Sequence, residues 1–127
     1  MRERKIVIFI LLAVLTFAGC TKSDRSEEAD RVTDELKELM FKNPERALAL
    51  VDSAEQAGVY AAADANLLRV NIYWNTGQKR MAAFYGEQAL ADTGVKRKSK
   101  TYYSALMVMV KWYEENGEYG KANELDD

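Results

Sequence analysis

The spacing of apolar and polar positions predicts that helices come in pairs. The clearest pair spans residues 65–91, where two apolar-periodic segments are separated by the turn triplet Asn75-Thr76-Gly77. A glycine at this point ends one helix, and a second helix can restart within two residues. Bulky residues of the first segment can then dock over small residues of the second. The bulky residues are Leu68, Ile72 and Tyr73, and the small ones are Ala82, Ala83, Gly86 and Ala89.

The same pattern predicts two more pairs. Helical periodicity begins at Val32, and Asn43-Pro44 ends this helix at about residue 42, because proline suits the first turn of the next helix. The second helix, residues 44–57, closes at Gly58, and the third pair spans 101–116 and 118–127 with Gly117 at the corner. We therefore expect an all-α fold in which residues 32–127 form a stack of three antiparallel helical hairpins.

Corresponding positions recur from one pair to the next. Ala47, Ala82 and Ala122 occupy equivalent places in the three second segments, at spacings of 35 and 40 residues, and Tyr73 and Tyr113 precede their corner glycines by the same interval. This pattern resembles the tetratricopeptide repeat (TPR). The resemblance implies an α-solenoid that binds proteins or peptides in a concave groove lined by the first helix of each repeat.

The resemblance also implies which residues line that groove. Trp74 is the leading contact candidate, because aromatic anchors dominate interface energies. The alternative is an ordinary solvated helix face on which Trp74 is partly buried. The groove candidates are Asp64, Asn71, Trp74, Asn75, Lys111, Glu114 and Glu115.

Segment 101–116 is apolar on two sides, which predicts neighbours on both. Tyr103 and Met107 belong to one side, and Ala105 and Met109 belong to the other. The segment after Gly117 is too short to cover such a surface. We therefore expect the chain to be completed by further repeats or by a partner.

The N-terminus predicts export. A basic head at residues 1–5 is followed by the apolar run 6–17, which is far shorter than the roughly 20 residues of a membrane span. Phe17-Ala18-Gly19-Cys20 resembles the lipobox of bacterial lipoproteins, which implies a signal peptide at 1–19 and lipidation of Cys20. Thr21, where aspartate would retain the protein at the inner membrane, implies the outer membrane. The alternative is ordinary cleavage after Ala18, which leaves a free thiol.

Two charged segments remain. Residues 20–31 carry no large apolar residue and are predicted to be a flexible tether after the lipidated cysteine. The only basic cluster, in the link before the third pair, either contacts an anionic surface or partner or is a solvated loop. It consists of Lys96, Arg97, Lys98 and Lys100.

The amino-acid composition argues against a catalytic function. The chain has no histidine, a single cysteine, no glycine-rich phosphate loop and a net charge of -2. These features argue against acid–base catalysis by histidine, a zinc site and nucleic-acid binding. We expect a protein that is not an enzyme and that requires neither a metal nor another cofactor.

Three functions fit these expectations. The first is an envelope lipoprotein scaffold that recruits a protein or peptide at the outer membrane, facing the periplasm or the surface. The second follows from residues 43–58 and 67–74, which together resemble the periplasmic repeat region of sensor kinases and transcription regulators of gut Gram-negative bacteria. On that interpretation the chain is a sensory input module truncated before its membrane span. The third is a glycan-capture lipoprotein, which requires Trp74 and Trp112 to be exposed for stacking on sugars.

Overall fold

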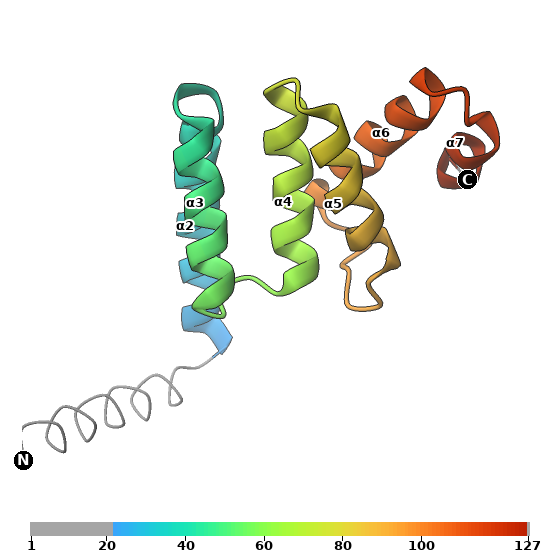
Figure 1. Ribbon diagram of the computed structural model, residues 1–127. Coiled ribbons are helices and arrows are strands. Elements are labelled where there is room, and N and C mark those ends of the chain that lie inside the picture. The colour runs from blue at the N-terminus through green and yellow to red at the C-terminus, as the bar shows by residue number, and fades with distance from the viewer. Residues whose placement is uncertain (1–21, 127) are drawn as a thin grey trace, which may run out of the picture.

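The computed structural model describes residues 22–126, and this part of the chain contains six helices and no strand. The predicted all-α class is therefore confirmed. The predicted signal peptide and Cys20 lie outside the described residues. The helices in Figure 1 are α2 (Lys22–Lys42), α3 (Pro44–Gln56), α4 (Ala62–Asn75), α5 (Lys79–Ala91), α6 (Lys100–Glu115) and α7 (Tyr119–Asp126).

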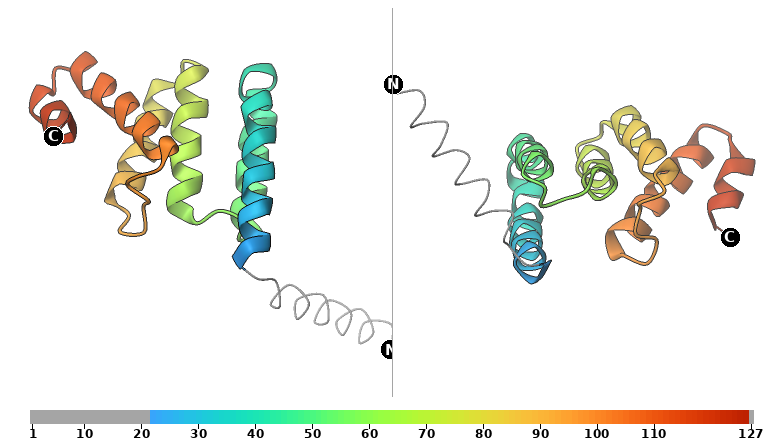
Figure 2. Two further views of the ribbon diagram at one scale, coloured as in Figure 1. Left: turned by 180° about the vertical axis from the view of Figure 1, so that it is seen from behind. Right: turned by 90° about the horizontal axis from the view of Figure 1, so that it is seen from below.

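The helices pack as three sequential pairs arranged in a row. Helix α2 packs on α3, α4 on α5, and α6 on α7. The first pair contacts the second through α2 and α3 against α4, and the second contacts the third through α4 and α5 against α6. Figures 1 and 2 show the pairs side by side, with the first and third separated by the second.

The turns between consecutive helices form where the sequence predicted them. Gly58, Gly77 and Gly117 have φ angles of 77°, 78° and 74°. This left-handed conformation suits glycine, which has no Cβ to clash with the backbone. At the first corner, the Asn43 side chain accepts a hydrogen bond from the Arg46 backbone N–H, and Pro44 begins α3. Local sequence therefore specifies where these helices end and restart.

Helix α2 begins at Lys22, ten residues before the expected start at Val32. The predicted flexible tether is therefore wrong for residues 22–31. Ala29 is half-buried against the first core cluster, and its carbonyl accepts a hydrogen bond from the Tyr60 hydroxyl. An ion pair between Glu28 and Arg31 adds a contact one turn apart on the helix surface. Part of the segment predicted as a tether therefore packs on the fold, through Ala29.

Helix α4 divides the core between the first two pairs. Ile72 joins Leu36 and Val51 in the first cluster, whereas Leu67 and Val70 join Ala82 and Ala89 in the second. The hairpin packing expected from the sequence is therefore only partly right. Leu68 and Ile72 face the first pair and not the small residues of α5, while Tyr73 packs in the second cluster as expected. The reason is that α4 has neighbours on two sides.

Helix α6 packs against α4, α5 and α7 and leaves one face exposed. Ala105, Val108 and Met109 are buried, and Gly86 of α5 lies directly against Met109. Tyr103 and Met107 are 54% and 67% exposed. Two residues of the second apolar side predicted for this helix, Tyr103 and Met107, therefore stay exposed in the part of the chain that the structure describes. Tyr113, from the same predicted side, packs in the third core cluster with Ala122 of α7.

Candidate functional site

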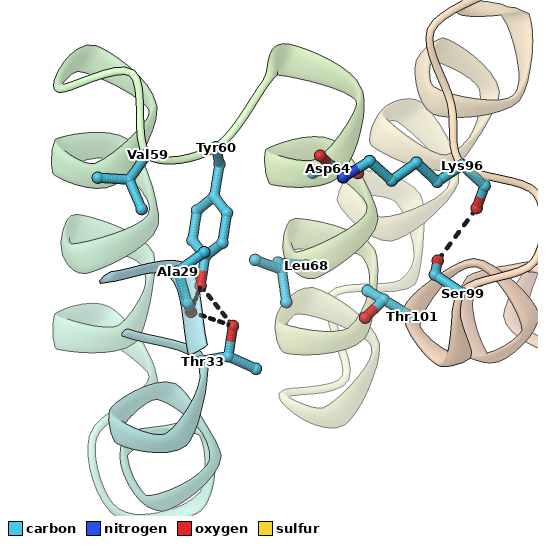
Figure 3. Close-up of a pocket in the computed structure, with 9 residues that line it drawn as sticks. All are labelled: Ala29, Thr33, Val59, Tyr60, Asp64, Leu68, Lys96, Ser99 and Thr101. Carbon is cyan, nitrogen blue, oxygen red and sulfur yellow. Dashed lines mark hydrogen bonds between the residues drawn. The ribbon is translucent and has the colours of Figure 1, made fainter. Parts of the chain in front are cut away.

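A pocket of about 200 Å³ opens between α2, the α3–α4 turn, α4 and the start of α6. It brings together segments from all three helix pairs, as Figure 3 shows. Its walls combine apolar side chains with hydroxyls and two opposite charges. The lining residues are Ala29, Thr33, Val59, Tyr60, Asp64, Leu68, Lys96, Ser99 and Thr101.

A hydrogen-bond cluster fixes the wall formed by α2 and Tyr60. The Tyr60 and Thr33 hydroxyl oxygens lie 2.7 Å apart, and both hydroxyls reach the Ala29 carbonyl, at 3.3 and 2.7 Å. Burial raises the pKa of Tyr60 and outweighs the lowering by Thr33, while Asp30 and Asp64 raise it further. Tyr60 is therefore neutral at physiological pH, and its hydroxyl holds the α3–α4 turn against α2.

The opposite rim carries the charges. Asp64 lies in the first turn of α4, and Lys96 lies in the loop before α6. Figure 3 shows their side chains extending toward each other. The loop is held by Val95, which is buried in the second cluster, and by Ser99, whose hydroxyl donates to the Lys96 carbonyl and accepts from the Tyr102 N–H. The pocket thus presents a carboxylate, an ammonium group and hydroxyls beside apolar walls.

These groups can form hydrogen bonds and ion pairs with a ligand. Hydroxyls, a carboxylate and an ammonium group can pair with peptide N–H and C=O groups, and the apolar walls can receive a side chain. Within residues 22–126, no group of three or more histidine, cysteine, aspartate or glutamate side chains lies close enough to hold a metal ion.

Other predicted groove residues make contacts of their own. Asn71 bridges α4 and α6, because its Oδ1 accepts from the Ser104 hydroxyl at 2.8 Å while its Nδ2 donates to the Leu67 carbonyl. Both ends of this amide are engaged. The contact fixes the first helices of the second and third pairs against each other.

Trp74 forms a small cluster at the other end of α4. It is half-buried against the second core cluster, and the Lys79 ammonium lies 5.0 Å from the centre of its ring. Lys79 also pairs with Glu115 at 3.0 Å. Trp74 and Glu115 are therefore brought together, but at the far end of α4 from Asp64. Asn75, Lys111 and Glu114 are exposed and lie outside the pocket.

The basic cluster is divided between the pocket and solvent. Lys96 lines the pocket, whereas Arg97, Lys98 and Lys100 are exposed outside it. Sequence reasoning treated the run as one unit and did not join Lys96 to Asp64. It also missed the hydroxyl residues. One signal was present, since Thr33 and Leu68 are 35 residues apart, the same spacing as Ala47 and Ala82.

A partly buried arginine on α4 forms ion pairs with two carboxylates of α3, next to the pocket. Arg69 of α4 contacts Asp52 at 2.7 Å and Glu55 at 2.6 Å, both on α3. Desolvation, the largest influence, lowers the pKa of Arg69, but hydrogen bonds and charge attraction from the two carboxylates outweigh it and leave the pKa raised. These contacts hold α4 on the first pair, beside the pocket.

Comparisons with protein-family models, with curated proteins and with solved structures found no match to this chain. The resemblance to TPR therefore rests on the residues of the chain itself. No helix within residues 22–126 has both the length and the apolar composition of a membrane span.

Proposed function

We propose that this protein is a non-enzymatic lipoprotein of the outer membrane, anchored through Cys20, that binds a protein or peptide partner. The binding surface is the side of a TPR-like solenoid formed by the first helices α2, α4 and α6. The pocket around Asp64 and Lys96 is the principal contact site on that surface.

The packing order supports the solenoid. Each pair contacts only the next pair in the row, and first helices contact first helices, α2 with α4 and α4 with α6. The aligned residues Ala47, Ala82 and Ala122 are 0%, 0% and 2% exposed. Small buried residues at equivalent positions are what close packing of repeated helices requires.

The pocket is the observation that carries the binding proposal. Its residues come from all three pairs, so a partner bound there would contact the whole array. An extended peptide fits the combination of hydroxyls, opposite charges and apolar walls, because the peptide backbone offers both donors and acceptors. The glycan alternative has less support, since Trp74 and Trp112 are half-buried against core clusters and the pocket has no tryptophan.

The test is a cross-linking pull-down from envelopes of the native host, with partners identified by mass spectrometry. Asp64→Lys reverses the charge at the pocket and is expected to lower partner recovery at least fivefold. Glu38→Lys makes the same charge reversal at an exposed position of α2 outside the pocket, and should leave recovery unchanged.

Equal recovery with both variants would overturn the pocket as the binding site. A Cys20→Ala chain should lose the partners by losing its anchor. Recovery of the sequence only within a longer polypeptide that carries a membrane span would favour the sensory module over the scaffold.

A further inference from the structure

Helix α6 carries an exposed face that the pocket does not use. Its residues follow one another at intervals of three, four, four and three, which places them on one side of the helix. All five are exposed, Tyr103 at 54% and Met107 at 67%. This α6 face consists of Lys100, Tyr103, Met107, Lys111 and Glu114.

The residues of the α6 face are arranged so that the face is complementary to a second copy of itself running in the opposite direction. Met107 is central, Tyr103 and Lys111 lie four residues on either side of it, and Lys100 and Glu114 lie seven residues on either side. A second copy of the helix, antiparallel and centred on Met107, therefore places each ammonium group opposite an aromatic ring or a carboxylate. Tyrosine and lysine can form a cation–π contact, and lysine and glutamate an ion pair.

We propose that the α6 face binds a second copy of this chain, with a two-fold axis at Met107. Such an interface is isologous, because the same patch serves both copies. Met107 packs on Met107, Tyr103 on Lys111, and Lys100 on Glu114. The exposed α6 face is thereby covered, and none of its five residues lines the pocket.

Charge at the helix ends favours the antiparallel arrangement. Helix α6 has no acidic residue in its first turn and no basic residue in its last turn. Instead Lys100 stands at its N-terminus and Glu114 and Glu115 at its C-terminus, the reverse of what a helix dipole favours. In the antiparallel pair each Lys100 lies beside the C-terminal end of the partner helix. A parallel pair would place like charges together.

The three charged side chains of the α6 face have no ion-pair or hydrogen-bond partner among residues 27–125. Lys100, Lys111 and Glu114 take part in none of the ion pairs or side-chain hydrogen bonds formed among residues 27–125. One helix face is small beside the roughly 1,600 Å² of a standard interface. We therefore expect a weak, exchanging dimer that is best detected by covalent trapping.

Disulfide trapping in the full chain tests the two-fold axis. Met107→Cys brings two thiols together at the axis, and oxidation with copper phenanthroline should yield several times more dimer than Phe84→Cys does. Phe84 is the matched control, because it is 53% exposed and belongs to α5. The parent chain measures any dimer formed through Cys20, and mass spectrometry of the linked peptide identifies the 107–107 bond. Equal yields at positions 107 and 84 would overturn the proposal.

A charge-swap series tests the register. In the Met107→Cys chain, Lys100→Glu and Glu114→Lys should each lower the dimer yield several-fold, because each places like charges opposite one another. The double variant restores both pairs with reversed sign and should recover the yield. Circular dichroism on the same variants verifies that they remain folded. A double variant that traps no better than the single variants would refute the antiparallel register.

Discussion

At the scale of single residues, a few polar contacts position whole helices. Tyr60 has its hydroxyl within 2.7 Å of the Thr33 hydroxyl and 3.3 Å from the Ala29 carbonyl. These contacts join residues about thirty positions apart in the chain, and they hold the α3–α4 turn on α2. A buried hydroxyl with such partners contributes about 1 kcal/mol. Its loss should therefore be measurable.

Tyr60→Phe is expected to lower the free energy of unfolding by about 1 kcal/mol at neutral pH. The substitution should also make the free energy of unfolding less dependent on pH in the alkaline range. Burial is the chief cause of the raised pKa of Tyr60, so the unfolded state loses this proton first as pH rises above about 10. The contribution of Tyr60 to stability is therefore fully present below about pH 10 and is lost as the pH rises further. The free energy of unfolding should fall more steeply with pH in the parent chain than in Tyr60→Phe.

Urea unfolding at a series of pH values up to 11 measures both effects. Tyr73 and Tyr113 also have a raised pKa, with burial the largest cause, so part of the alkaline slope should persist in the variant. Tyr119→Phe, at a side chain 64% exposed, is the control and should change stability by less than about 0.5 kcal/mol. Identical slopes for Tyr60→Phe and the parent would contradict the assignment.

At the scale of helices, close approach depends on small residues at particular crossings. Gly86 of α5 packs on Met109 of α6, and a Cβ added there would lie 2.9 Å from the Met109 Cγ and closer still to its Sδ. Met109 is 0% exposed and belongs to the core cluster shared by α5, α6 and α7. The second and third pairs can therefore approach this closely only with glycine at position 86.

Gly86→Ala is expected to destabilise the protein by about 1–3 kcal/mol, because Met109 must move within a packed core. Gly120→Ala provides the opposite control. A Cβ at Gly120 in α7 meets no atom within 4 Å, so alanine should stabilise by about 0.5–1 kcal/mol through its helix propensity. Denaturant unfolding measures both variants. A neutral Gly86→Ala would show that the α5–α6 crossing tolerates a wider spacing.

At the scale of the whole molecule, the three pairs form a row in which only neighbours touch. Within residues 22–126, α2 and α3 pack against no helix later in the chain than α4. The core is correspondingly divided into three clusters and not joined into one. The stability of such an array is approximately the sum of the stability of each pair and of the interfaces between neighbouring pairs. A destabilising substitution in one pair should therefore affect mainly that pair.

Leu36→Ala tests this arrangement in the first pair. Leu36 is 1% exposed, and truncation to alanine should cost about 2–5 kcal/mol. Hydrogen exchange followed by mass spectrometry should show protection lost in α2 and α3 but largely kept in α6. Uniform loss of protection along the chain would indicate a single cooperative core and would contradict the row of separable pairs.

Much of the fold could be predicted because its signals are local. Asn43-Pro44 and the glycines Gly58, Gly77 and Gly117 act on the backbone of their own turn, so the ends of the helices that precede them were predicted to within one or two residues. The start of α2 was not, because residues 22–31 carry no apolar periodicity, and the contact of Ala29 with Tyr60 joins positions 31 residues apart. Likewise, apolar periodicity showed that Ile72 is buried but not which neighbour covers it.

The candidate site was harder to predict than the fold. Asp64 and Lys96 were both singled out, yet nothing in the sequence joined them to each other or to Thr33 and Tyr60. The sequence by itself determined the helices and their corners, because periodicity, proline and glycine act over a few residues. Only the tertiary structure decided which helix faces meet and which face of α6 stays open, because burial depends on helices distant in the chain.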